Sequence, residues 1–172
     1  MKDSSEASAE QIANAKKLLG TVRHAAYATV NKDGTPHNSP LMLIYDEDLT
    51  KLYIGSHSDS LHSKNIERTG KAFVVLFDSF VKGQGGVYIT AVNGHECQGE
   101  ELAEALRVHN AVRARYGSNA IEQSFYMAPK PAQRMYSLDI EKIEVYSSER
   151  NSEGLIVRET RTQVSATALL EA

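Results

Sequence analysis

Residues 27–41 read Tyr27-Ala28-Thr29-Val30-Asn31-Lys32-Asp33-Gly34-Thr35-Pro36-His37-Asn38-Ser39-Pro40-Leu41 and contain two strand-like segments around a tight turn. Alternating side chains predict strands over 24–31 and 35–45, and the Asp-Gly pair between them is a strong hairpin signal. Pro36 and Pro40 lack backbone donors, so we expect the second strand to lie at a sheet edge or to be bulged. This stretch therefore predicts an antiparallel sheet.

Further strand patterns follow along the chain. They cover 51–56, 71–77, 87–98, 134–146 and 155–161. The continuous apolar run within 71–77 predicts a central strand that is buried on both faces. Short connections between so many strands favour a small antiparallel β-barrel with peripheral helices, a mainly β (α+β) fold.

Three helices are predicted around these strands. Ser8 and Gln11 fit a capping box for a helix through Leu19, with Gly20 just past its end. A short helix is expected from Ser58 or Ser60 to Arg68, with Gly70 as its C-terminal residue. The clearest helical periodicity covers 100–116, where acidic residues begin the segment and Arg113 and Arg115 end it.

Length and composition exclude several classes of protein. With 172 residues and no change of composition along the chain, we expect a single domain over 1–172, with its core at about 18–146 and C-terminal strands and tail at 147–172. The net charge of -3 gives no basic face for nucleic acid. No apolar run approaches a membrane span, and the single cysteine favours a reducing compartment, so a cytoplasmic location is expected.

The segment from Ser56 to Asn65 is the best candidate for a binding site. Hydroxyls and groups with permanent or switchable positive charge gather there, at the start of the predicted short helix. They are Ser56, Ser58, Ser60, Ser63, His57, His62 and Lys64. Free N–H groups at a helix N-terminus add donors, so the segment could hold a phosphate monoester. A solvated serine-rich helix cap explains the same residues equally well.

Other reactive residues have simpler interpretations. His57 and His62 are five positions apart, which is not the spacing of a helical ligand pair, so no metal site is predicted. Cys97 is interpreted as a small residue at a strand end rather than as a catalytic thiol. The glycines within 83–86 are interpreted as a flexible turn, because neither nucleotide-binding fingerprint is completed there.

The order of these motifs resembles the pyridoxamine 5'-phosphate oxidase-like family, whose members have an FMN-binding split β-barrel. The resemblance covers about 18–146. The supporting motifs are Ala28-Thr29-Val30-x-x-Asp33-Gly34-x-Pro36, Ser39-Pro40-Leu41, Tyr45-Asp46, Leu52-Tyr53-Ile54-Gly55-Ser56, Ser60-x-His62-x-x-Asn65-Ile66, Val74-Val75-Leu76-Phe77 and Val87-Tyr88-Ile89-Thr90-Ala91. Each motif is weak alone, but their order and spacing are fairly specific.

The resemblance implies a homodimer with FMN in a cleft between the subunits. The implied cofactor-binding residues are Asn38, Ser39, Leu41, Ser56, Ser60, Leu61, His62 and, on charge and proximity only, Lys64. The family usually has Lys or Arg at the position of His62 and often Arg at that of Asn38. This chain therefore lacks two fixed positive charges that would otherwise face the phosphate.

The leading hypothesis for function is a flavin-dependent oxidoreductase that acts on a small organic molecule. The flavin would supply the redox chemistry, so no side chain is predicted as a catalytic acid or base. A non-enzymatic flavin or haem binding or sensor protein on the same barrel is the alternative from another class. A deazaflavin in place of FMN also stays open.

Overall fold

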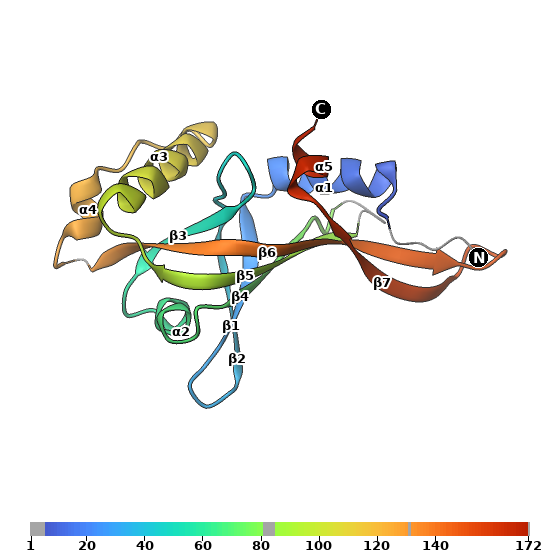
Figure 1. Ribbon diagram of the computed structural model, residues 1–172, viewed down its shortest axis with the longest axis horizontal. Coiled ribbons are helices and arrows are strands. Elements are labelled where there is room, and N and C mark those ends of the chain that lie inside the picture. The colour runs from blue at the N-terminus through green and yellow to red at the C-terminus, as the bar shows by residue number, and fades with distance from the viewer. Residues whose placement is uncertain (1–5, 81–84, 131, 172) are drawn as a thin grey trace.

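The computed structural model describes residues 6–80, 85–130 and 132–171, which form a curled antiparallel sheet with helices on its outside (Figure 1). The strands are β1 (His24–Val30), β2 (Pro36–Met42), β3 (Lys51–His57), β4 (Ala72–Phe77), β5 (Gly86–Glu96), β6 (Gln133–Arg150) and β7 (Ile156–Val164). The helices are α1 (Ala9–Thr21), α2 (Leu61–Thr69), α3 (Gly99–Arg115), α4 (Gln123–Met127) and α5 (Ala166–Leu170). The sheet order is β2-β1-β4-β5-β6-β3, and β7 also pairs with β6. The predicted fold class, an antiparallel split barrel with peripheral helices, is confirmed.

The hairpin of β1 and β2 forms as predicted. Its register runs from His24 opposite Met42 to Val30 opposite Pro36. At the turn, Gly34 has a φ of 85°, a left-handed conformation that glycine adopts without steric cost. Because β2 is the first strand of the sheet order, its prolines leave no ladder hydrogen bond unmade, and the predicted edge strand is confirmed.

The long strand β6 organises the other side of the sheet. Its first part pairs with β3, from Lys51 opposite Asp139 to His57 opposite Gln133. Its last part pairs with β7 as a two-stranded ribbon that extends away from α3 and α4 (Figure 1). The free edge of β3 meets the chain that follows β2, and this contact almost closes the sheet into a barrel.

Two apolar clusters lie on opposite sides of β3. The main core fills the inside of the curled sheet beneath α1 and includes Leu18, Tyr27, Leu52, Ile89 and Leu138. The second cluster lies between the outer side of β3 and the helices α3 and α4, and it includes Tyr53, Leu102, Leu106, Tyr126 and Met135. Even-numbered residues of β3 therefore face the barrel, whereas odd-numbered residues face the two helices.

Three expectations about individual elements need correction. Gly20 does not end α1, because the helix continues to Thr21 and the N–H of Val22 still bonds to the carbonyl of Leu18. β4 is buried on one face only: alternate residues from Ala72 are buried, whereas Phe77 is 57 % exposed. The helices and the inside of the barrel cover only one side of this strand. β6 extends to Arg150, beyond the predicted end at 146, because it continues to pair with β7.

No element was predicted in the tail at the end of 147–172, yet it forms α5. Ser165 caps this helix by accepting a hydrogen bond from the N–H of Ala168, and Leu169 joins the main core. The glycine turn predicted within 83–86 lies partly outside the described residues. In the part of the chain that the structure describes, no helix is long and apolar enough to cross a membrane.

Candidate functional site

The barrel opens between β2 and β3, and we call this opening the split. The N–H of Tyr53 bonds to the carbonyl of Ile44 at 2.9 Å, and Tyr45 forms an isolated bridge with Leu52. Beyond these contacts β2 pairs with β1 and β3 pairs with β6, so the two strands separate. The first turn of α2 lies beside this opening, since the chain enters the helix directly after β3.

His62 of α2 bridges the split with its side chain. Its Nδ1 lies 3.1 Å from Oγ of Ser39 on β2, and its Nε2 lies 2.6 Å from Oγ of Ser56 on β3. Oγ of Ser60, which precedes α2, lies 3.0 Å from the same Nε2. Four of the residues implied as cofactor contacts therefore meet at one point, which sequence spacing alone did not require.

The same hydroxyl network continues on both sides of His62. Nε2 of His37 lies 3.0 Å from Oγ of Ser39, and the rings of His37 and His62 are stacked with centroids 6.4 Å apart. On the helix side, Oγ of Ser60 lies 2.8 Å from that of Ser63. Burial lowers the pKa of His62, and the neighbouring His37 lowers it further. Near neutral pH the network therefore contains a neutral imidazole at His62.

The other implied contacts surround this network at the surface. Asn38 and Leu61 are exposed, and Leu41 is half-buried against the main core. Lys64 is exposed and pairs with Asp59 at 3.0 Å, which holds the pKa of that carboxyl below its usual value. The ammonium group of Lys64 is thus already engaged, and it is screened by water.

Backbone donors are available where α2 begins. The first helical hydrogen bond joins the N–H of Lys64 to the carbonyl of Ser60, so the N–H groups of Leu61, His62 and Ser63 have no partner within the helix. The Ser60 side chain does not cap them, because it bonds to the carbonyl of His57 instead. These groups, together with the neighbouring hydroxyls, fit a phosphate of a bound cofactor better than the imidazole of His62 does.

A cavity of about 290 Å³ lies next to the network, between the split and the helices α3 and α4. We call it the α3–α4 cavity. Apolar side chains from β2, α4 and the loops form most of its wall, and the polar groups are His109, Arg113, Tyr126 and Gln133. Its floor includes Gly55, the residue before Ser56, so the cavity and the network share one strand.

Gly55 is required by the close approach of α4. A Cβ atom on this residue would lie 2.8 Å from the hydroxyl of Tyr126 and 3.5 Å from Cε1 of His109. The Tyr126 hydroxyl lies 3.2 Å from Nδ1 of His109. Burial lowers the pKa of His109 to about 4, with a further contribution from the charge of Arg113, and burial raises the pKa of Tyr126 to about 12. Both groups are therefore neutral near pH 7.

Sequence reasoning missed this cavity. His109 and Arg113 lie within the helix predicted over 100–116, where no binding site was expected, and α4 was not predicted. A histidine among apolar stripe residues was the available signal, but a buried structural histidine fits it equally well. Cys97, by contrast, lies directly after β5, at a strand end as predicted, and burial raises the pKa of its thiol to about 12.

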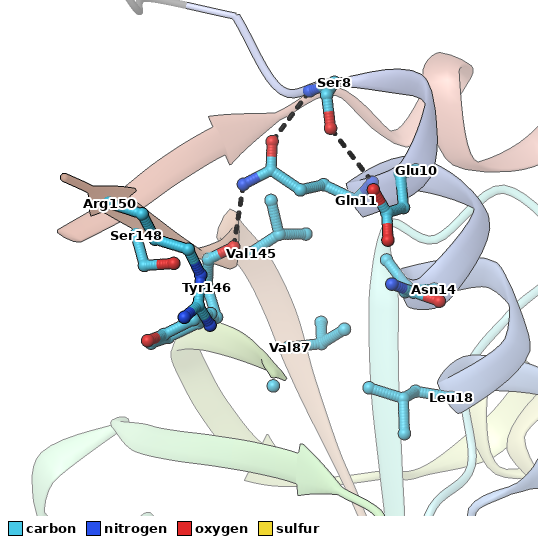
Figure 2. Close-up of a pocket in the computed structure, with 12 residues that line it drawn as sticks. Ser8, Glu10, Gln11, Asn14, Leu18, Val87, Val145, Tyr146, Ser148 and Arg150 are labelled. Carbon is cyan, nitrogen blue, oxygen red and sulfur yellow. Dashed lines mark hydrogen bonds between the residues drawn. The ribbon is translucent and has the colours of Figure 1, made fainter. Parts of the chain in front are cut away.

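Two further cavities lie away from the split. One of about 430 Å³ separates α1 from β6, and Gln11 crosses it to donate to the carbonyl of Tyr146 (Figure 2). Another of about 700 Å³ lies on the open outer face of β1, β4 and β5 and is lined by apolar residues such as Val30, Phe73 and Val92. None of the predicted cofactor contacts lines either cavity.

Comparison with known proteins identifies one matching family. The sequence profile of pyridoxamine 5'-phosphate oxidase matches residues 12–147. No curated protein sequence matches the chain.

Solved structures share the fold at low sequence identity. A heme binding protein from Mycobacterium smegmatis matches with a TM-score of 0.60 and 15% identity over 96% of this chain, which spans only 61% of that protein. A Clostridium acetobutylicum protein of the pyridoxinephosphate oxidase family, related to general stress protein 26, matches with a TM-score of 0.62 and 9% identity over 92% of this chain and 97% of that one. An F420 reductase matches with a TM-score of 0.54 and 14% identity over 75% of this chain and 94% of that one. At such identities the likeness shows the fold alone.

Proposed function

Because this chain belongs to the pyridoxamine 5'-phosphate oxidase family, we propose that it binds FMN at the split and acts as an oxidoreductase on a small organic molecule. The observation that supports this proposal best is the convergence of Ser39, Ser56 and Ser60 with the free N–H groups of α2. Bound FMN would accept electrons from one substrate and pass them to another.

The residues of this chain divide into three roles in the proposed complex. The N–H groups at the start of α2 hold the phosphate, because together they offer several donors without requiring a buried cation. Leu41 and the exposed Asn38 on β2 lie along the cofactor. The α3–α4 cavity excludes water beside it, and Arg113 provides a positive charge for a substrate with an acidic group.

We further propose that the cofactor is shared by a homodimer, as expected for the family. The outer face of β1, β4 and β5 carries exposed apolar side chains, with Val30 48 % and Phe77 57 % exposed, and Arg161 of β7 lies over the rings of Phe73 and Tyr88 at one side of it. An apolar sheet face of this kind is typical of a protein–protein interface, and we propose a second copy of this chain as its partner. A cytoplasmic location agrees with the free thiol of Cys97.

A haem protein on the same fold is the second candidate. It is favoured by the stacked imidazoles of His37 and His62 at the split, because imidazole is a common axial ligand of haem iron. The M. smegmatis heme binding protein has the same fold. Deazaflavin is a further alternative, since an F420 reductase has this fold too.

Reconstitution with FMN tests the proposal. We expect the purified protein to retain FMN through desalting and to show a two-band flavin absorption spectrum. Retention of haem with a Soret band, or of deazaflavin, without retention of FMN would contradict the proposal. Consumption of NADH or NADPH by the FMN-loaded protein would then separate an enzyme from a carrier.

Leu61 offers a sharper test of where the phosphate lies. This side chain is 54 % exposed in the first turn of α2, so a change of charge there leaves the core intact. We expect Leu61→Lys to strengthen and Leu61→Glu to weaken FMN binding by about fivefold each, since a charge near a helix N-terminus contributes about 1 kcal/mol. Leu170→Glu, on the similarly exposed Leu170 of α5, is the control. Equal affinities of the two Leu61 variants would place the phosphate elsewhere.

A further inference from the structure

The imidazole of His62 joins side chains from β2, from β3 and from the start of α2. Ser39 belongs to the edge strand β2 and Ser56 to the other edge strand β3, and Ser60 directly precedes α2. All three hydroxyls lie within 3.1 Å of a ring nitrogen of His62. His62 is only 9 % exposed, so it reaches these partners inside the protein rather than at its surface.

The direction of the hydrogen bonds at Nε2 follows from Ser60. The hydroxyl of Ser60 donates its single proton to the carbonyl of His57 at 2.8 Å, because a carbonyl oxygen can only accept. Toward His62, the same oxygen must therefore accept. Nε2 of His62 consequently carries a proton, which it shares between Ser60 and Ser56.

The other ring nitrogen then has the opposite role. In a neutral imidazole with its proton on Nε2, Nδ1 is an acceptor, so it accepts from the hydroxyl of Ser39 at 3.1 Å. The oxygen of Ser39 is thereby left to accept from Nε2 of His37 at 3.0 Å. The donors of Ser60, His62, Ser39 and His37 each have an acceptor in this chain of bonds, and the acceptor role of Nδ1 requires His62 to be neutral.

We infer that the neutral imidazole of His62 is a bridge that holds β2 and β3 at a fixed separation across the split, and that it is not the cation that neutralises a bound phosphate. His62 is thus a positioning residue for the ligand site. The part of this inference that concerns a phosphate rests on the proposed function, whereas the bridge itself does not.

The charges around His62 agree with this role. The titratable groups near the network are His37 from β2, His57 from β3, and Lys64 with its partner Asp59 from the helix side. On the far side of Ser63 lies Tyr136 of β6, whose hydroxyl donates to Glu67 of α2. Among the described residues, no carboxylate forms an ion pair with His62 that would stabilise its charged form. A protonated ring would also turn Nδ1 into a second donor toward Ser39, whose oxygen already accepts from His37.

Nitrogen-15 NMR of the histidine rings tests the bridge in the protein without cofactor. We expect His62 to be neutral at about pH 7, with its proton on Nε2, and to titrate below the usual histidine range of about 6.5. A charged ring at that pH, or a proton on Nδ1 of the neutral ring, would overturn the bridge. Because this measurement uses the unaltered chain without FMN, it does not depend on the proposed function.

Three variants distinguish a bridging role of His62 from a role as the positive charge that neutralises a bound phosphate. His62→Gln keeps a neutral donor and acceptor, His62→Lys adds a permanent cation that cannot accept, and His24→Gln replaces an exposed histidine of β1 as the control. If His62 is a bridge, FMN binds the Lys variant at least tenfold more weakly than the Gln variant, and the Lys variant also unfolds at a lower temperature. If His62 is the counter-charge, the Lys variant binds FMN more tightly than the wild type, and the inference fails.

The outcomes also distinguish this inference from the proposed function. Failure of the wild type to retain FMN would reject the flavin proposal, while the NMR result and the relative unfolding temperatures would still decide the bridge. A wild type that binds FMN but has equal stability and affinity in the Gln and Lys variants would reject the bridge alone.

Discussion

At the scale of single residues, His109 in the α3–α4 cavity makes the free energy of unfolding depend on pH. Its pKa is about 4 in the folded protein, compared with about 6.5 in an unfolded chain. Above about pH 6.5 both states are neutral, so the histidine costs no stability. As the pH falls below about 6.5, His109 becomes protonated in the unfolded state but stays neutral in the folded state. The free energy of unfolding therefore decreases until the pH reaches the pKa of His109 in the folded protein.

We therefore expect the free energy of unfolding to fall by about 2 kcal/mol between about pH 7 and pH 5 through His109. His109→Gln removes this part of the pH dependence, whatever it does to stability at pH 7, and the exposed His24→Gln leaves it in place. Denaturant unfolding at several pH values measures the slope. An unchanged slope in His109→Gln would show that the ring is already protonated or exposed.

At the scale of elements, the side chain of Arg134 on β6 holds the C-terminal end of α4 in place. With only five residues, α4 is too short to be stable alone. Arg134 donates to the carbonyls of Tyr126 and Ala128 at 3.3 and 3.0 Å, and its Nε lies 3.3 Å from a carboxylate oxygen of Glu96. These bonds tie the end of α4, and with it one wall of the cavity, to the sheet.

Replacement of this arginine should loosen α4 without unfolding the barrel. In Arg134→Ala we expect amide hydrogen exchange within 123–127 to accelerate at least tenfold, since hydrogen bonds to a charged group contribute about 1.5–3 kcal/mol. The matched control is Arg107→Ala, which removes an exposed arginine paired with Glu104. Equal protection of α4 in both variants would contradict this role of Arg134.

At the scale of the whole molecule, the proposed homodimer depends on the outer face of β1, β4 and β5. Val30 lines its cavity and is 48 % exposed, so an acidic residue there should change the fold little. If a second copy covers this face, Val30→Asp weakens the dimer at least tenfold, because it buries a charge at an apolar contact. Sedimentation equilibrium measures this change. Leu155→Asp, on a residue 59 % exposed just before β7, is the control, and a wild-type monomer would refute the interface.

The amino-acid sequence by itself determined the local features of this protein. The Ser8–Gln11 capping box, the Asp33-Gly34 turn, the edge position of the proline-containing strand and the end of α2 at Gly70 all form as predicted. Each depends on hydrogen bonds or steric limits among residues only a few positions apart, so the sequence pattern is sufficient. The order of these local features was also enough to indicate the family.

Only the tertiary structure decided how the site residues act. Ser39 and His62 are 23 positions apart, and nothing in their spacing indicates that the ring would turn inward to bridge two strands. Similarly, His109 and Tyr126 meet above Gly55 because α3 and α4 pack on one side of β3. The alternating burial of β4 likewise depends on which sheet face the helices leave open. Such contacts arise from long-range packing, which residue type and periodicity do not specify.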